Sequence, residues 1–182
     1  MKQWLNGFTL IELLVTIFII MLLLFVAIPS FNNYGRYNEL QQMAETIKSD
    51  ILETKNYALS PPQDRKIVGG EVYKIVFFAA SSSDPGKYKI FEEGNSEPIL
   101  DGGIGPDYPL EIINPSSVDS KLEIKFSIPQ AGKIIEPINV SNNTINVRIK
   151  SNRISDQSKN FIDILVDTVT GKVELKPSWQ SL

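Results

Sequence analysis

The stretch LNGFTLIELLVTIFIIM, residues 5–21, decides how this chain is organised. It opens an apolar run over residues 8–28 whose only polar members are Thr9, Glu12 and Thr16. At a rise of about 1.5 Å per residue, a helix of this length spans the roughly 30 Å hydrocarbon core of a bilayer. An ionised side chain inside such a run is costly unless it is paired or shallow, so Glu12 needs an explanation.

Two ordinary readings of this segment leave something unexplained. A secretory signal peptide has a shorter apolar region followed by a small-x-small site, and Ala27 and Ser30 are not spaced for such a site. A single-pass anchor fits the length but gives Glu12 no role. Lys2 is the only charged side chain ahead of the run, which predicts a cytoplasmic N-terminus with the rest of the chain outside.

The sequence GFTLIELLV, residues 7–15, resembles the N-terminal signal of type IV pilins and of the pseudopilins of type II secretion and competence systems. Gly7, Phe8 and Glu12 match that pattern in register, and Pro29 matches a proline that is usual near the end of the apolar run. The resemblance implies cleavage by a prepilin peptidase after Gly7, methylation of the new N-terminal Phe8, and entry of the helix into a filament. It also implies other pilin or pseudopilin subunits and an inner-membrane assembly platform as partners, and no cofactor.

Elementary chemistry accounts for these residue types. Gly7 has no Cβ, so a protease can approach its backbone closely. A cut after Gly7 gives Phe8 a cationic amine one helical turn from the Glu12 carboxylate, which also suits the start of a helix. The pair forms either within one subunit or, as the resemblance implies, between neighbours. Pro29 lacks an N–H and crowds the preceding turn, which predicts a kink in the helix.

The rest of the chain divides into a helix and a β-rich head. We expect a cytoplasmic leader over residues 1–7, a membrane and filament-core helix over 8–28, its amphipathic continuation over 29–59, and a globular head over 60–182. The continuation carries apolar residues at helical spacing, which predicts one buried stripe. These residues are Leu40, Met43, Ala44, Ile47, Ile51 and Ala58.

Beyond residue 63 the apolar pattern changes to the period of two that is typical of strands. Turn-forming segments rich in Gly, Ser, Asn and Asp separate the apolar runs. The last run, residues 160–175, reads as a hairpin that turns near Thr170 and Gly171. The expected strands lie within residues 71–80, 87–91, 109–113, 121–128 and 144–150 and in this hairpin.

The predicted fold is therefore α+β, with a long bent N-terminal helix packed on an antiparallel sheet, as in pilins. The closing IDILVDTVTGKVEL is similar to the C-terminal strands of minor pilins and pseudopilins of the GspH/FimT type. The chain has no cysteine, which departs from the many pilins whose C-terminal loop is closed by a disulfide.

Composition argues against catalysis. The chain has neither cysteine nor histidine, which removes the best thiol nucleophile, the commonest general base and the softest metal ligands. No spacing of Ser, Lys or Asp singles out another catalytic group, so we predict that the protein is not an enzyme. The net charge of −3 has no long block of one sign and does not indicate a nucleic-acid partner.

Two weaker candidates lie in the head. Asp101 and Asp107 flank the glycines of DGGIGPD, and their oxygens suit calcium, but two carboxylates are few for that ion and a glycine turn is the simpler reading. DNA is a second candidate partner, because six basic residues gather in the last third, although acidic residues interrupt them and no aromatic ladder accompanies them. These six are Arg148, Lys150, Arg153, Lys159, Lys172 and Lys176.

We therefore expect a prepilin that spans the cytoplasmic membrane once, with its head outside, and then joins an extracytoplasmic filament as a structural subunit. The subunit would be a minor pilin or pseudopilin, and the alternatives are a DNA-binding minor pilin of a competence pilus or a pseudopilin of a type II secretion system.

Overall fold

The computed structural model describes residues 8–60, 72–82, 86–92, 94–116, 120–127, 134–136 and 141–180. The side chains of residues 26–33, 127, 134–136, 141 and 180 lie outside that description. The chain forms two compact units, Met1–Arg36 and Tyr37–Leu182. Residues 37–59, which we assigned to the helix, therefore fold together with the head.

One helix, α1, runs from Leu10 to Leu59 over 50 residues. Its first backbone bond joins the Leu13 N–H to the Thr9 carbonyl at 3.2 Å, which makes Thr9 the N-cap. The long helix expected from the sequence is confirmed, and Pro29 lies inside it. The kink at Pro29 stays a prediction, because its side chain lies outside the description.

The second half of α1 buries the apolar stripe that the periodicity predicted. Leu40, Ala44, Ile47 and Ala58 are fully buried, and Ile51 is 1% exposed. Met43 is partly buried and packs against the same cluster. The stripe lies on one side because residues three and four apart share a helix face.

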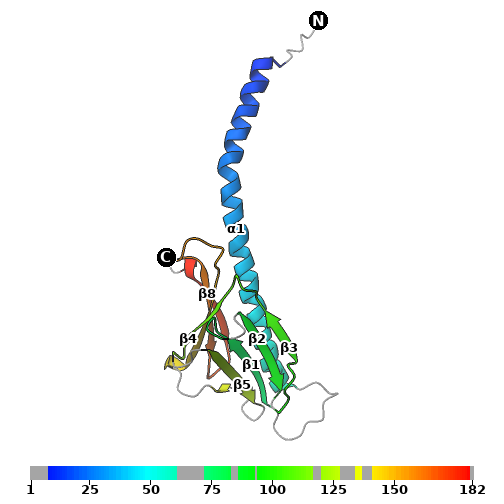
Figure 1. Cartoon of the computed structure of the whole chain (residues 1–182), viewed down its shortest axis with the longest axis vertical. Helices are drawn as coiled ribbons and strands as arrows, with labels where there is room; N and C mark the ends of the chain where they lie inside the picture. The colour runs from blue at the N-terminus through cyan, green and yellow to red at the C-terminus, as the bar shows by residue number, and fades with distance from the viewer. Residues whose placement is uncertain are drawn as a thin grey trace. The chain divides into compact units, whose positions relative to one another are not determined.

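Nine strands in the described part of the head form two antiparallel sheets, labelled in part in Figure 1. The five-stranded sheet has the order β3-β2-β1-β5-β6, and the four-stranded sheet has the order β4-β7-β8-β9. The strands of the first sheet are β1 Val72–Phe78, β2 Lys87–Glu92, β3 Leu100–Gly103, β5 Lys121–Ser127 and β6 Ile134–Glu136. Those of the second are β4 Leu110–Asn114, β7 Thr144–Lys150, β8 Phe161–Asp167 and β9 Val173–Pro177. Two short 3-10 turns, Ser141–Asn143 and Ser178–Gln180, complete the described elements.

The predicted α+β fold, with the helix packed on antiparallel strands, is confirmed, but the strands form two sheets where we expected one. Two strands were missed: β6, and β3, whose sequence LDGG reads as a glycine turn. Gly102 of β3 pairs with Tyr88 of β2. A Cβ on Gly102 would lie 2.3 Å from Cζ of Tyr88, so the glycine permits close approach of the tyrosine ring within the sheet.

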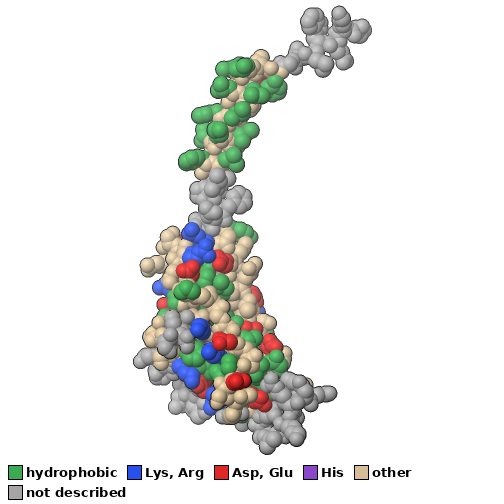
Figure 2. All heavy atoms as spheres, turned by 45° about the vertical axis from the view of Figure 1, so that its right-hand side comes forward, with side chains coloured by type: hydrophobic (Ala, Val, Ile, Leu, Met, Phe, Trp, Pro, Cys, Tyr) green, Lys and Arg blue, Asp and Glu red, His purple; other side chains and the backbone are tan. Residues whose placement is uncertain are grey.

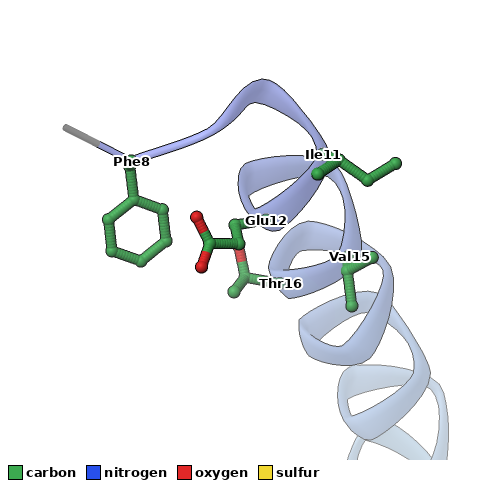
Figure 3. Close-up of a pocket in the computed structure, with 5 residues that line it drawn as sticks. All are labelled: Phe8, Ile11, Glu12, Val15 and Thr16. Atoms are coloured by element: carbon green, nitrogen blue, oxygen red, sulfur yellow. The ribbon is translucent and has the colours of Figure 1, made fainter. Parts of the chain in front are cut away.

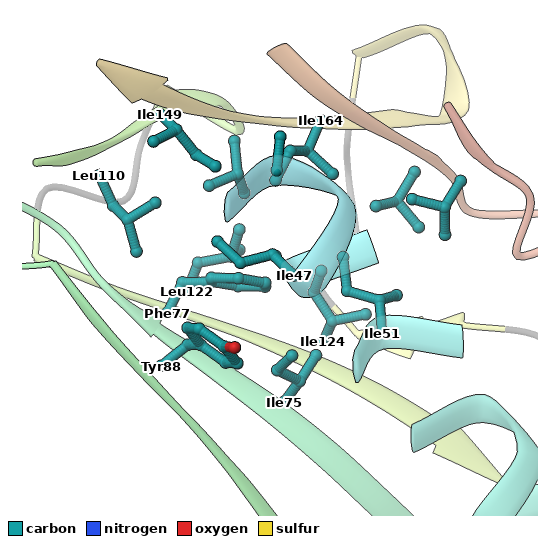
Figure 4. Packing of buried hydrophobic residues seen from close by; sticks show 14 of the residues in the cluster. Ile47, Ile51, Ile75, Phe77, Tyr88, Leu110, Leu122, Ile124, Ile149 and Ile164 are labelled. Atoms are coloured by element: carbon teal, nitrogen blue, oxygen red, sulfur yellow. The ribbon is translucent and has the colours of Figure 1, made fainter. Parts of the chain in front are cut away.

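The core of the head lies between the two sheets, with α1 inside it. Figure 4 shows Ile47 and Ile51 of α1 between Ile75 and Ile124 of the five-stranded sheet and Ile164 of the four-stranded sheet. All five side chains are at most 1% exposed. Because both sheets pack on the same helix, α1 holds the head together.

Candidate functional site

The start of α1 is closed by three hydrogen bonds between Thr9 and Glu12, in which each residue both donates and accepts. The Thr9 N–H donates to Oε2 of Glu12 at 3.0 Å, and the Thr9 hydroxyl donates to the same oxygen at 2.8 Å. The Glu12 N–H in turn lies 3.3 Å from the Thr9 hydroxyl oxygen. This arrangement is a capping box, which satisfies N–H groups that the first turn of a helix leaves without partners.

The Glu12 carboxylate therefore has a fixed place at the positive end of the helix dipole. Figure 3 shows it on the same side of the helix as the Phe8 ring, with Thr16 one turn further on. Together with Ile11 and Val15, these residues line a hollow on the helix surface. The hollow combines apolar walls with one anionic group, which suits a partner that is apolar and carries a cation.

The N-terminal part of α1 exposes almost only apolar side chains. Between Phe8 and Phe25, the exposed fraction of the large apolar side chains runs from 46% for Ile17 to 86% for Phe25. Figure 2 shows these green side chains around the segment. Burying a side chain of this kind is worth about 1.5–3 kcal/mol, so the segment as a whole gains strongly from an apolar environment or an apolar partner.

Within the described residues, no helix meets the length and hydropathy expected of a membrane-spanning segment.

Of the residues expected to form the processing and assembly site, the structure brings Phe8 and Glu12 together. Gly7 lies outside the described residues. Sequence reasoning missed Thr9, although the spacing Thr9-x-x-Glu12 ahead of an apolar run is a sequence signature of the capping box. Our interpretation of Glu12 considered a partner created by cleavage and the helix dipole, and it overlooked the partner already present in the chain, Thr9.

The candidate calcium ligands do not form a site in the described structure. Asp101 lies on β3 and pairs with Lys89 of β2 at 3.3 Å. The backbone carbonyl of Asp107 accepts a hydrogen bond from the Asn152 N–H at 2.9 Å. Among the described residues, no three Asp or Glu side chains lie close enough together to hold a metal ion. The DGGIGPD segment thus contributes a strand and a loop that is tied to its neighbours.

Four of the six basic residues considered for DNA binding are paired with carboxylates in the described part of the head. Arg148 makes two hydrogen bonds to Asp163, at 2.7 and 3.1 Å, which raise the pKa of its guanidinium. Its guanidinium also lies 3.7 Å from the centroid of the Phe161 ring. The other pairs are Lys150 with Glu111 at 3.9 Å, Arg153 with Glu39 at 3.0 Å and Lys172 with Glu174 at 2.5 Å. Their charges are largely balanced within the head.

One comparison with known proteins concerns the N-terminal segment. The family model described as the prokaryotic N-terminal methylation motif matches residues 6–28. One solved structure similar to the chain is the type IV minor pilin FimU of Pseudomonas aeruginosa, at 16% sequence identity and a TM-score of 0.49, covering 77% of this chain and 94% of that one. No curated protein matches the chain.

The matched motif includes Gly7, Phe8 and Glu12, the three residues on which the resemblance was based. The resemblance to type IV pilin-like proteins is thereby confirmed in the N-terminal segment, where residues 6–28 carry a prokaryotic N-terminal methylation motif.

Proposed function

We propose that the protein is a structural subunit of a type IV pilus-like filament, either a minor pilin or a pseudopilin. A prepilin peptidase cuts it between Gly7 and Phe8, Phe8 is methylated, and residues 8–28 hold it in the membrane until it joins the filament. Its work is assembly and not catalysis. The observation that carries the proposal is the Glu12 carboxylate, fixed by Thr9 at the start of an exposed apolar helix.

The geometry of this end of the helix suits packing between identical helices. Apolar side chains surround the segment, so a bundle of such helices removes a large apolar area from water or lipid headgroups. Thr9 occupies Oε2 of Glu12, and Oε1 remains as a further acceptor on the carboxylate. The ammonium group of a processed Phe8, in the same or a neighbouring subunit, would supply the matching cation.

The test replaces Glu12 by valine. Glu12→Val should leave membrane insertion and peptidase cleavage intact, because neither step uses the carboxylate, but should strongly reduce incorporation into filaments. The matched control is Thr16→Val, which removes a polar group from the same hollow one turn away. Incorporation is measured as the amount of protein in sheared filaments relative to the amount in membranes. Normal incorporation of Glu12→Val would show that the carboxylate has no part in assembly.

Within this function, a DNA-uptake subunit and a type II secretion pseudopilin are the alternatives. The neighbouring genes distinguish these alternatives. Genes for an outer-membrane secretin with secretion components indicate secretion, and genes for competence proteins indicate DNA uptake. A salt-dependent shift of DNA by the purified protein tests the DNA-binding alternative directly.

A further inference from the structure

The turn that leads into β7 carries a sequence suited to asparagine-linked glycosylation. Residues 142–144 read Asn-Asn-Thr. The pattern Asn-x-Ser or Asn-x-Thr, in which x is not proline, is the acceptor for N-linked glycans on surface loops of secreted proteins. A second such pattern begins at Asn139, which lies outside the described residues. The inference therefore concerns Asn142.

Asn142 lies at the tip of a tight turn. Asn142 and Asn143 are both exposed, and Thr144 is half-buried as the first residue of β7. The φ angles of the two asparagines are 58° and 54°, in the left-handed region that asparagine adopts more readily than most residues. The acceptor amide is thus carried by an exposed turn, where a modifying enzyme can reach it.

Hydrogen bonds hold the turn without using the acceptor amide. The Asn143 carbonyl accepts from the Thr168 N–H at 2.8 Å and from the Thr168 hydroxyl at 3.0 Å. The Thr144 hydroxyl donates to the Asn142 carbonyl at 3.1 Å, so the two residues that define the acceptor pattern are in contact. In the described part of the chain, no hydrogen bond uses the side-chain amide of Asn142, and its Nδ2 atom is free to react.

A hollow beside the turn suits a sugar ring. Thr144 lines it, and its volume of about 260 Å³ is far larger than the roughly 30 Å³ share of one water molecule. Its walls combine one aliphatic side chain with a hydroxyl and charged groups, which matches the apolar face and the hydroxyl edges of a sugar. The other residues of the wall are Leu165, Asp167, Lys172 and Glu174.

We propose that Asn142 is the attachment site of an N-linked glycan. This inference rests on the proposed function, in which the head lies outside the cytoplasm, where secreted proteins display such acceptors. The donor is an oligosaccharide carried on a lipid diphosphate. Nδ2 of Asn142 forms a bond to C1 of the first sugar while the C1–O bond breaks. The lipid diphosphate leaves with the bonding electrons, and the amide proton passes to a base of the transferring enzyme.

The test is the mass of one peptide from the full-length protein recovered from membranes of its host. Trypsin cuts after Lys133 and Arg148 and releases residues 134–148, which contain Asn142. The peptide should be heavier than its sequence by a chain of sugar residues, and fragmentation should place the added mass on Asn142. A peptide of unmodified mass, or sugar on Asn139 alone, overturns the proposal.

Paired substitutions identify the acceptor pattern. Thr144→Val keeps the shape of the side chain but removes the hydroxyl, and it should abolish the modification. Thr144→Ser keeps the hydroxyl and should keep the modification, which separates loss of the pattern from damage to the turn. Asn142→Gln should also abolish the modification, and Asn139→Gln is the control that should leave it in place. A glycan that persists in Thr144→Val overturns the proposal.

The outcome is separable from that of the proposed function, because the same sample also provides the N-terminal peptide. A chain that begins at Phe8 and has an unmodified 134–148 peptide rejects the glycan alone. A chain that begins at Met1 and carries sugar on Asn142 rejects the proposed processing alone.

Discussion

Gly102 leaves room for the Tyr88 ring at the place where β3 pairs with β2. Glycine is usually unfavourable in a strand interior, yet Gly102 is the residue that lets the tyrosine ring lie across the strand pair. The Tyr88 hydroxyl then donates to Oδ2 of Asp50 on α1 at 2.5 Å. Gly102 thus allows the tyrosine of β2 to lie against β3 and to reach the helix.

Gly102→Ala should destabilise the head by about 1–3 kcal/mol, the usual cost of forcing extra volume into a packed site. The matched control is Gly103→Ala, because a Cβ on Gly103 has no heavy atom within 4 Å. Urea unfolding of the full chain in detergent measures both changes. Equal destabilisation by the two substitutions would contradict the steric role of Gly102.

Asp50 and Asp167 should affect the pH dependence of stability with opposite signs. Partial burial raises the pKa of Asp50 from its ordinary value of 3.8, and the neighbouring Glu53 adds to this, while the Tyr88 hydrogen bond opposes it. A carboxyl group whose pKa is raised in the folded state stabilises the fold below its unfolded pKa, and this contribution is lost as the pH rises through the folded pKa. The backbone N–H and the hydroxyl of Thr170 instead lower the pKa of Asp167, so its contribution is present above the unfolded pKa and lost as the pH falls.

The measurement is the urea midpoint of each variant at several pH values from about 3 to 7. Relative to the unsubstituted chain, Asp50→Asn should become more stable as the pH rises above 3.8. Asp167→Asn should be less stable than the unsubstituted chain above pH 3.8, and this difference should shrink as the pH falls below 3.8. Midpoints that run parallel to those of the unsubstituted chain would contradict both assignments.

At the scale of elements, the second half of α1 is the centre of the head. Its buried stripe lies in one cluster with residues of both sheets (Figure 4). Because side chains of this stripe are packed on both sides, water cannot fill the space left when one of them is shortened.

Ile47→Ala should therefore cost about 2–5 kcal/mol of unfolding free energy, because it opens a cavity in the core. Leu52→Ala is the matched control on the same helix, since Leu52 is 36% exposed, and it should cost about 1 kcal/mol or less. Chemical unfolding followed by circular dichroism measures both. A small effect of Ile47→Ala would show that the helix does not hold the two sheets together.

Local patterns explain which elements could be predicted. The helical spacing of Leu40, Ala44 and Ile47 and the alternation of Ile162 and Ile164 are visible within a few residues, and both elements are as expected. The division into two sheets depends on pairing between strands far apart in the sequence, which no local pattern records. β3 was missed because Gly102 is explained only by the ring of Tyr88 on another strand.

The same distinction holds for the candidate site. Gly7, Phe8 and Glu12 form a short motif and were found from the sequence, and Thr9 was available from its spacing to Glu12. The ion pair between Arg148 and Asp163 could not be predicted from the sequence, because the two residues meet only through the pairing of β7 with β8. A count of basic residues could not reveal that neutralisation.

At the scale of the whole molecule, the proposed assembly depends on the N-terminal segment of α1. In the proposed function, burial of the exposed apolar segment of α1 would supply the free energy of assembly, and Glu12 would supply a polar group whose position Thr9 fixes. All of this depends on one covalent step, because the cation proposed for Glu12 exists only after the chain is cut.

The most direct test of cleavage between Gly7 and Phe8 is a mass measurement. It is made on the N-terminal peptide of the protein recovered from membranes of its host. The proposed processing predicts a chain that begins at Phe8 and carries one methyl group on its amine, and it predicts uncut precursor when Gly7 is replaced by leucine. A chain that begins at Met1, or at any residue other than Phe8, would contradict it.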